Sequence, residues 1–257
     1  MKRLNNVKCF LLDMDGTVYL SGEVIEGARE AVERMRRRGR VVFLTNNTSV
    51  SRADYVLKLS RMGFDAEPED VYTAGNATAD YLKEYHGGKK VFLLGTDSLR
   101  AEFGGAGIPL CADNPDLVVI GFDTSLTYKN LTAACDFIRE GVPYLLTHPD
   151  INCPKKDGYM PDVGSFAALI KTSTAREPFI ICGKPHKPIA DGVKKLTGFL
   201  PYETAMVGDR LATDMAFAKN NGFISVLVLT GATSKSDLKQ SGASVDVVLD
   251  SVAFWDI

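Results

Sequence analysis

Short runs of apolar residues, each followed by a polar turn, recur along this chain. Runs of this kind cover residues 7–12, 41–44, 179–182, 204–207 and 224–229. They are almost continuously apolar, which is typical of strands buried on both faces of a parallel sheet. Segments with apolar residues at helical spacing lie between several of them. This alternation predicts an α/β fold with a doubly wound, Rossmann-like parallel sheet.

The ends of the predicted elements follow from spacing and from turn residues. Apolar positions at helical spacing predict a helix over 28–38, which Gly39 ends, and Ser51 caps a second helix. Further helices are expected over 128–139, 165–174 and 189–196 and from Asp214 onward, further strands over 90–95, 117–121, 143–147 and 246–249, and a small hairpin over 18–23. The segment 148–164 shows no regular pattern, and loops of that length inside compact domains are usually functional.

Length and composition place the chain among ordinary globular proteins. It has 257 residues, enough for one large domain or two modest ones, with 45% apolar and 24% charged residues. The net charge of −2 favours neither a nucleic-acid polymer nor a membrane surface as partner. No apolar run approaches the roughly 20 residues of a membrane span. Five cysteines without paired spacing indicate reduced thiols, and so a cytoplasmic protein.

Two carboxylates follow the first buried run. Asp13 and Asp15 are separated by one residue, so in an extended segment their side chains point the same way. Two acids so close repel each other unless a cation or a raised pKa relieves the repulsion. Such a pair also occurs in turns and in the metal-nucleotide motif of glycosyltransferases. An EF-hand loop is excluded, because Thr17 and Val24 occupy its fifth and twelfth positions. The pair predicts a metal site with one acid protonated.

Polar residues also follow three other apolar runs. Thr45 and Asn46 come after the second, Lys184 follows 179–182, and Asp209 and Asp214 follow 204–207. The carboxyl ends of parallel strands lie at one edge of a sheet, so we expect these side chains to share one pocket. Carboxylates with a lysine and a hydroxyl suit Mg²⁺ and a phosphate, whereas no His/Cys cluster is present for zinc.

Taken in order, these motifs resemble those of the haloacid dehalogenase superfamily of phosphotransferases. The similarity is to its 4-nitrophenylphosphatase and NagD-like branch, in the runs Asp13-Met14-Asp15-Gly16-Thr17, Thr45-Asn46-Asn47, Thr147-His148-Pro149-Asp150, Gly183-Lys184-Pro185 and Gly208-Asp209-Arg210. The resemblance implies a discontinuous core domain, residues 1–75 and 183–257, and an inserted α/β cap domain, residues 76–182.

The resemblance also implies roles for the residues of these motifs. Asp13 would attack phosphorus and form an aspartyl-phosphate, and Asp15 would act as general acid and then as general base. The carboxylates of Asp13 and Asp209, with the backbone carbonyl of Asp15, would bind Mg²⁺, and Asp214 would hold the waters of the metal. Thr45, the Asn46 N–H and Lys184 would hold the phosphoryl oxygens.

The substrate contacts are less sharply indicated. Asn47 is expected beside the phosphate, and the segment 148–164 is expected to contact the leaving group. His148 could meet a substrate there, but a lone histidine before a proline is at least as often a hydrogen-bonded loop residue.

The sequence therefore predicts a Mg²⁺-dependent phosphatase that hydrolyses small phosphomonoesters. A dehalogenase would need neither the second acid nor a metal. A phosphomutase, or a regulatory module phosphorylated on Asp13, remains an alternative. Sugar phosphates, nucleotides and similar metabolites are all compatible substrates. An exposed cap could also pair two chains as a homodimer.

Overall fold

The computed structural model describes residues 4–155 and 157–255 of the chain. These residues form two compact units. The first unit contains the chain up to Thr45, Val56–Tyr72 and the chain from Lys184 onward, and the second contains Asn46–Tyr55 and Thr73–Gly183. The core and cap boundaries expected after residues 75 and 182 stay a prediction. The segment 46–55, expected within the core domain 1–75, belongs to the second unit.

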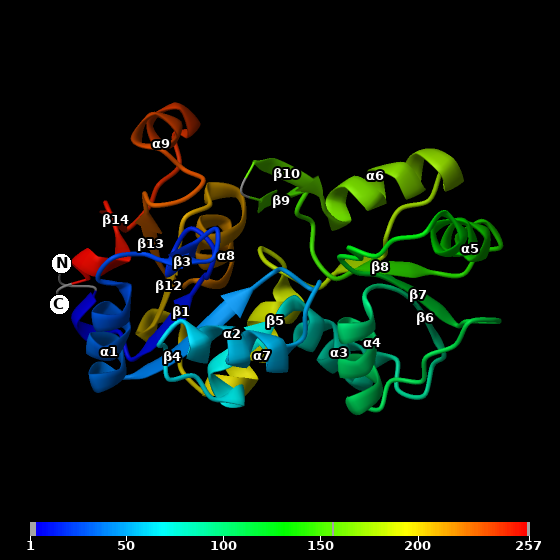
Figure 1. The fold of residues 1–257 in the computed structure, drawn as a ribbon, viewed down its shortest axis with the longest axis horizontal. Coiled ribbons are helices and arrows are strands. Elements are labelled where there is room, and N and C mark those ends of the chain that lie inside the picture. Colours follow the sequence, from blue (N-terminus) through cyan, green and yellow to red (C-terminus); the bar gives the residue numbers. More distant parts are fainter. Residues whose placement is uncertain (1–3, 156, 256–257) are drawn as a thin grey trace. The chain divides into compact units, whose positions relative to one another are not determined.

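The first unit is built on a six-stranded sheet with the strand order β14-β13-β12-β1-β4-β5 (Figure 1). Its strands are β1 (Cys9–Leu12), β4 (Arg40–Thr45), β5 (Val71–Thr73), β12 (Thr204–Gly208), β13 (Ile224–Val228) and β14 (Val247–Leu249). β1 pairs in parallel with β12 and β4, and β13 pairs in parallel with β12 and β14. The predicted parallel-sheet α/β fold is confirmed, and the strand predicted over 246–249 lies at the edge of the sheet as β14.

The central strand of this sheet is buried along its whole length. Every residue from Cys9 to Leu12 is 0% exposed, which explains why this run is continuously apolar. Phe10 packs edge to face against Trp255, with 5.3 Å between ring centroids. The strand order reverses beside β1, since β4 and β5 lie on one side of it and β12, β13 and β14 on the other. Open α/β sheets bind ligands at the carboxyl ends of strands at such a switch point.

Helices and a small hairpin complete the first unit. They are α1 (Ala28–Arg38), α7 (Lys187–Thr197), α8 (Ala216–Asn221) and α9 (Lys235–Ser241), the hairpin strands β2 (Tyr19–Leu20) and β3 (Glu23–Val24), and the 3₁₀ segments Leu4–Asn6, Pro68–Asp70, Pro201–Glu203 and Val252–Phe254. α1 and the hairpin confirm the predictions for these segments. α2 (Arg52–Arg61) begins in the second unit and ends in the first.

The helix expected to begin at Asp214 begins later. Leu211–Met215 forms a π-helical turn, and α8 starts at Ala216. The Met215 N–H donates to the Arg210 carbonyl oxygen five residues earlier, and the Arg210 N–H donates to Asp214 Oδ2, both at 3.1 Å. The side chain of Asp214 thus closes the wide turn that contains it, which the apolar spacing alone did not indicate.

The second unit has its own four-stranded sheet, with the order β11-β8-β7-β6 and parallel pairing throughout. Its strands and helices are β6 (Val91–Leu94), β7 (Leu117–Ile120), β8 (Tyr144–Leu146), β11 (Ile180–Ile181), α3 (Ala74–Tyr85), α4 (Asp97–Gly105), α5 (Tyr128–Arg139) and α6 (Val163–Thr174). α3 and α4 pack on one face through Leu82 and Phe103, and α5 and α6 pack on the other through Ile138 and Ile170 (Figure 1).

Several elements of this unit differ from the sequence prediction. The segment 148–164, expected to be irregular, contains an antiparallel hairpin of β9 (Asn152–Lys155) and β10 (Gly158–Pro161). β11 belongs to this second sheet, so the strand before Lys184 is not a strand of the first sheet as expected. No helix was predicted over α3 because Ala74–Ala79 is buried throughout, which removes the polar face that marks a helix.

No helix in the described part of the chain is both long enough and apolar enough to cross a membrane.

Candidate active site

Lys184 is the centre of a buried polar group in the first unit. Its side chain is only 2% exposed. The ammonium Nζ donates to Asp13 Oδ1 at 2.6 Å, to Asp214 Oδ1 at 2.8 Å and to the Leu44 carbonyl oxygen at 3.2 Å. One lysine therefore joins the residue after β1, the end of β4 and the π-helical turn after β12. It does so although the strand that precedes it lies in the other sheet.

Asp209, directly after β12, is held by close backbone contacts. Its Oδ2 accepts a hydrogen bond from the Ala232 N–H at 2.6 Å. A Cβ on Gly16 would lie 2.4 Å from this oxygen and a Cβ on Gly231 only 2.0 Å, so both positions need glycine. Gly16 also has a φ of +90°, which glycine adopts most readily. The other oxygen, Oδ1, is buried and has no hydrogen-bond partner among the described residues.

The carboxylates of Asp13, Asp209 and Asp214 form a group that fits a divalent cation. Each offers one oxygen, and these oxygens lie within 4.8 Å of one another. A buried carboxylate oxygen without a partner is costly, and a cation beside Asp209 Oδ1 would remove that cost. When all three carboxylates are ionised, one ammonium leaves negative charge that a divalent cation would neutralise. Carboxylate oxygens suit Mg²⁺ or Ca²⁺ rather than softer metals.

The charge states of this group follow from burial and from its neighbours. Burial raises the pKa of Asp13 to about 8, with the carboxylates of Asp214 and Asp209 adding to the effect and Lys184 opposing it. Burial, together with Asp214, raises the pKa of Asp209 to about 6. Burial alone would lower the pKa of Lys184, but Asp13 and Asp214 raise it by more, so the amine stays charged.

Asp15 and Thr45 are close in sequence to two residues that accept hydrogen bonds from Lys184, Asp13 and Leu44 respectively. Asp15 follows Asp13 by two residues and forms an isolated bridge with Tyr19 of the hairpin. Burial raises the pKa of the Asp15 carboxyl above its usual range, and Lys58 partly opposes that rise. Thr45 is the last residue of β4 and is 7% exposed.

Asn46 and Asn47 belong to the second unit, where both amides contact the segment 148–164. Asn46 Nδ2 lies 3.2 and 3.3 Å from the two carboxylate oxygens of Asp150. Asn47 Oδ1 accepts hydrogen bonds from the N–H and the hydroxyl of Ser49, while its Nδ2 lies 3.6 Å from Cys153 Sγ.

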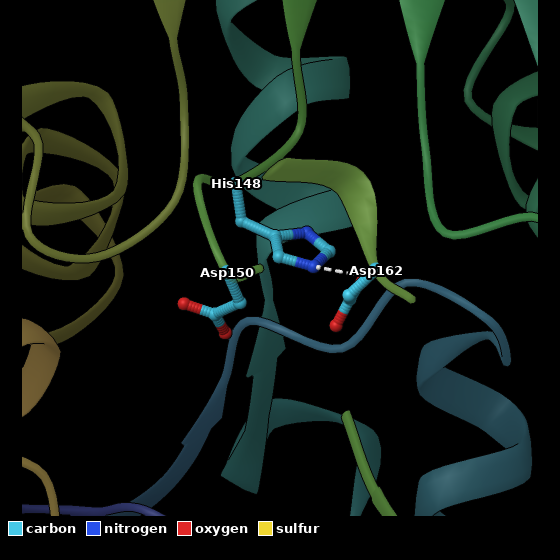
Figure 2. A group of neighbouring side chains, drawn as sticks. All are labelled: His148, Asp150 and Asp162. Carbon is cyan, nitrogen blue, oxygen red and sulfur yellow. Dashed lines mark hydrogen bonds and ion pairs between the residues drawn. The ribbon is translucent and has the colours of Figure 1, made fainter. Parts of the chain in front are cut away.

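His148 is fully buried in the same unit. Its ring points toward Asp162 (Figure 2). Its Nδ1 lies 3.0 Å from Thr147 Oγ1, and its Nε2 lies 3.0 Å from Asp162 Oδ1. Asp162 caps α6 by accepting from the Val163 N–H at 2.7 Å. Both ring nitrogens are thus engaged within the protein, which supports a structural role. Direct substrate contact by His148 stays a prediction.

No role was predicted for Asp150 or Asp162 from the sequence. Asp150 ends a run that carries the family resemblance, and Asp162 precedes an apolar helix as a capping residue would. With His148 these two form a second group of potential metal ligands (Figure 2). Unlike the group in the first unit, it contains no buried side-chain oxygen or nitrogen without a partner among the described residues.

Comparison with known proteins shows the family. The sequence model of haloacid dehalogenase-like hydrolases matches residues 10–109, and a second, HAD-hydrolase-like, matches residues 181–254. An acid sugar phosphatase of Staphylococcus haemolyticus is 34% identical over 239 residues, which cover 92% of this chain and 90% of that protein. This chain belongs to the haloacid dehalogenase-like hydrolases.

Solved structures of this hydrolase family agree with that assignment. A 4-nitrophenylphosphatase from Thermotoga maritima is 43% identical, with a TM-score of 0.95 and coverage of 98% of this chain and 97% of that one. NagD from Escherichia coli K-12 is 29% identical, with a TM-score of 0.88 and coverage of 97% and 98%. The predicted resemblance to the 4-nitrophenylphosphatase and NagD-like branch is confirmed, and the protein is a phosphatase of this hydrolase family.

Proposed function

We propose that this phosphatase depends on Mg²⁺ and hydrolyses small phosphomonoesters, sugar phosphates among them, through an aspartyl-phosphate on Asp13. The observation that carries the proposal is the group around Lys184, where one ammonium meets two carboxylates and Asp209 Oδ1 lies buried without a partner. The similarity to an acid sugar phosphatase and to a 4-nitrophenylphosphatase supports the substrate class.

The metal would be held by the carboxylates of Asp13 and Asp209 and by the backbone carbonyl of Asp15, with Asp214 holding its waters. The bound cation would neutralise charge on the phosphoryl oxygens. The choice of Mg²⁺ rests on the all-oxygen donor set and on a phosphorylated substrate.

Asp13 would be the nucleophile. Lys184 donates to Asp13 Oδ1, so we assign the attack to Oδ2. An Oδ2–P bond forms while the bond between phosphorus and the leaving-group oxygen breaks. Water then attacks phosphorus, the Oδ2–P bond breaks, and phosphate leaves with the Asp13 carboxylate restored.

Asp15 would move the protons of both steps. It would give a proton to the departing alkoxide and then take one from the attacking water. The raised pKa of its half-buried carboxyl supports this role, because the acid must hold a proton near neutral pH.

The phosphoryl oxygens would be held by Thr45, the Asn46 N–H and Lys184. Asn47 is proposed as a further contact on the substrate. The cap of residues 76–182 is proposed to supply the leaving-group contacts. A cytoplasmic location and a homodimer remain predictions.

The nucleophile is tested by Asp13→Asn with 4-nitrophenyl phosphate as substrate and Mg²⁺ present. We expect turnover to fall by about 10⁴-fold or more, because an amide cannot form the phosphorylated intermediate. The matched control is Asp113→Asn at an exposed position of the second unit, which should hydrolyse like the wild type. A folded Asp13→Asn variant that retains turnover would defeat the proposal, as would full activity of the wild type in a chelator.

The acid role of Asp15 predicts a dependence on the leaving group. Asp15→Asn should lower kcat by about 10²- to 10⁴-fold for alkyl phosphates, whose leaving groups need a proton. The loss should be clearly smaller for 4-nitrophenyl phosphate. Equal losses across a series of leaving-group pKa values would contradict the role.

A further inference from the structure

The side chain of Asn46 is fixed from two sides within the second unit. Its Nδ2 faces both carboxylate oxygens of Asp150, and the residue is only 5% exposed. On the other side, a Cβ on Gly183 would lie 2.7 Å from Asn46 Oδ1, so that oxygen packs directly against the Gly183 backbone. Hydrogen bonds to a charged acceptor are stronger than neutral ones. The orientation of the carboxamide is therefore set by Asp150.

Asp150 is itself held by the first turn of α6. Its carbonyl oxygen accepts a hydrogen bond from the Gly164 N–H at 2.8 Å. A Cβ on Gly164 would lie 2.4 Å from the Pro149 carbonyl oxygen and 3.0 Å from that of Asp150. Only glycine permits this close approach, so the backbone of residues 149 and 150 is fixed against the helix start.

A second pair of residues flanks Asp150 and holds the same segment. His148 Nε2 lies 3.0 Å from Asp162 Oδ1, the residue that caps α6. The segment from His148 to Asp150 is thus attached to the start of α6 at two points, one through side chains and one through backbone. Asp150 is consequently a fixed acceptor rather than a mobile surface acid.

We propose that Asp150 is a positioning residue for the phosphate site and acts through Asn46. Asn46 follows Thr45 by one peptide bond, and its anchored side chain restricts the position of the Asn46 Cα, to which the backbone N–H is attached. This inference rests on the proposed function, in which that N–H holds a phosphoryl oxygen. Asp150 touches neither the substrate nor the metal in this assignment.

The test is a double-mutant cycle of Asn46→Ala and Asp150→Ala, measured as kcat/KM for 4-nitrophenyl phosphate with Mg²⁺. We expect each single variant to lose about tenfold to hundredfold, the range for a lost hydrogen bond to a charged group. The double variant should lose no more than the worse single one, since both changes break the same contact. Asp150→Asn keeps an acceptor oxygen and should retain most activity. Losses that multiply in the double variant would overturn the inference.

Inhibition by inorganic phosphate separates positioning from general damage to the fold. In Asp150→Ala the inhibition constant of phosphate should rise by a factor similar to the loss in kcat/KM, and the loss should be equal for aryl and alkyl substrates. A variant that unfolds at the wild-type denaturant midpoint yet binds phosphate normally would refute a role at the phosphate site. Asp113→Ala, at an exposed site of the same unit, is the control.

The activity of the wild-type protein separates failure of the proposed function from failure of this inference. A wild-type protein that does not hydrolyse phosphomonoesters defeats the proposed function and this inference together. An active wild type with multiplied losses defeats the inference alone.

Discussion

Lys184 and its partners Asp13 and Asp214 place three ionisable groups in a buried position. The ammonium is buried between two carboxylates, and all three groups lose most of their contact with water. Breaking a buried ion pair by removing one partner costs far more than the pair itself contributes, because the remaining charges stay buried.

We therefore expect Lys184→Met to lower the free energy of unfolding by about 3–5 kcal/mol and to abolish measurable hydrolysis. The measurement is urea unfolding in parallel with an activity assay. Lys235→Met is the matched control, because Lys235 pairs with Asp250 at the surface, where both side chains are more than half exposed, and should change stability by less than about 1 kcal/mol. Equal effects at both lysines would contradict the buried-pair argument.

Glu102 gives a prediction about pH that does not involve the candidate site. Its Oε1 accepts hydrogen bonds from the Arg52 N–H and from Asn76 Nδ2, both at 2.9 Å, while its Oε2 is buried without a partner among the described residues. Burial raises the pKa of Glu102 above the usual 4.5, and the Arg52 and Asn76 hydrogen bonds only partly oppose this.

The folded state therefore binds the Glu102 proton more tightly than the unfolded state does. Its contribution to stability is complete below pH 4.5 and is lost as the pH rises through the folded-state pKa. Relative to wild type, Glu102→Gln should become more stable as the pH rises from acid to neutral. Denaturant unfolding of both proteins across that range measures the difference, and a constant difference would contradict the assignment.

At the scale of elements, two turns shape the site around Asp209. The turn after β1 and the turn after β13 each approach its carboxylate through a glycine, at Gly16 and Gly231. The loops thus hold Asp209 Oδ2 by backbone contact rather than by additional side chains, and they leave Oδ1 without a partner among the described residues.

Gly231→Ala should displace the Asp209 carboxylate and lower Mg²⁺ affinity by about 10- to 100-fold, the range for disturbed outer contacts of metal ligands. Calorimetric titration of Mg²⁺ measures this affinity. Gly104→Ala is a suitable control, because a Cβ there meets nothing within 4 Å. Unchanged affinity in Gly231→Ala would show that Asp209 does not hold the metal.

Some of these elements could be predicted from the sequence, and others could not. Continuous apolar runs identify the central strands because those strands are buried on both faces. The same burial conceals α3, whose first residues have no polar face. The apolar run of β11 was placed in the wrong sheet, because apolar content alone does not indicate which strand it pairs with.

The site residues show a similar limit. The motifs bring attention to Asp13, Lys184, Asp209 and Asp214, and the structure places the three carboxylates in one group with the amine bonded to two of them. Their catalytic roles stay predictions. Asp150 could not be singled out, because its contact with Asn46 joins residues more than a hundred positions apart and depends on how the chain folds.

At the scale of the whole molecule, the two units carry two different carboxylate groups. Only the group in the first unit includes a buried oxygen without a partner among the described residues. Mg²⁺ should therefore slow amide hydrogen exchange around β12 and Ala232 and leave β6 and β7 unaffected. Hydrogen-exchange mass spectrometry with and without Mg²⁺ tests this expectation. Protection confined to the second unit would show that the metal binds there instead.

The segment Asn46–Tyr55 has a practical consequence for anyone who builds hybrids from related phosphatases. It belongs to the second unit and is held there by hydrogen bonds. The Thr48 hydroxyl accepts from the Phe122 N–H and is hydrogen-bonded to the Thr147 hydroxyl, and the Arg52 N–H donates to Glu102. If residues 76–182 alone were exchanged, the native segment 46–55 would face different residues at the positions of Glu102, Phe122 and Thr147. A hybrid made to test whether residues 76–182 set substrate preference should carry the donor's own 46–55 as well, so that each hydrogen-bonding group keeps its partner.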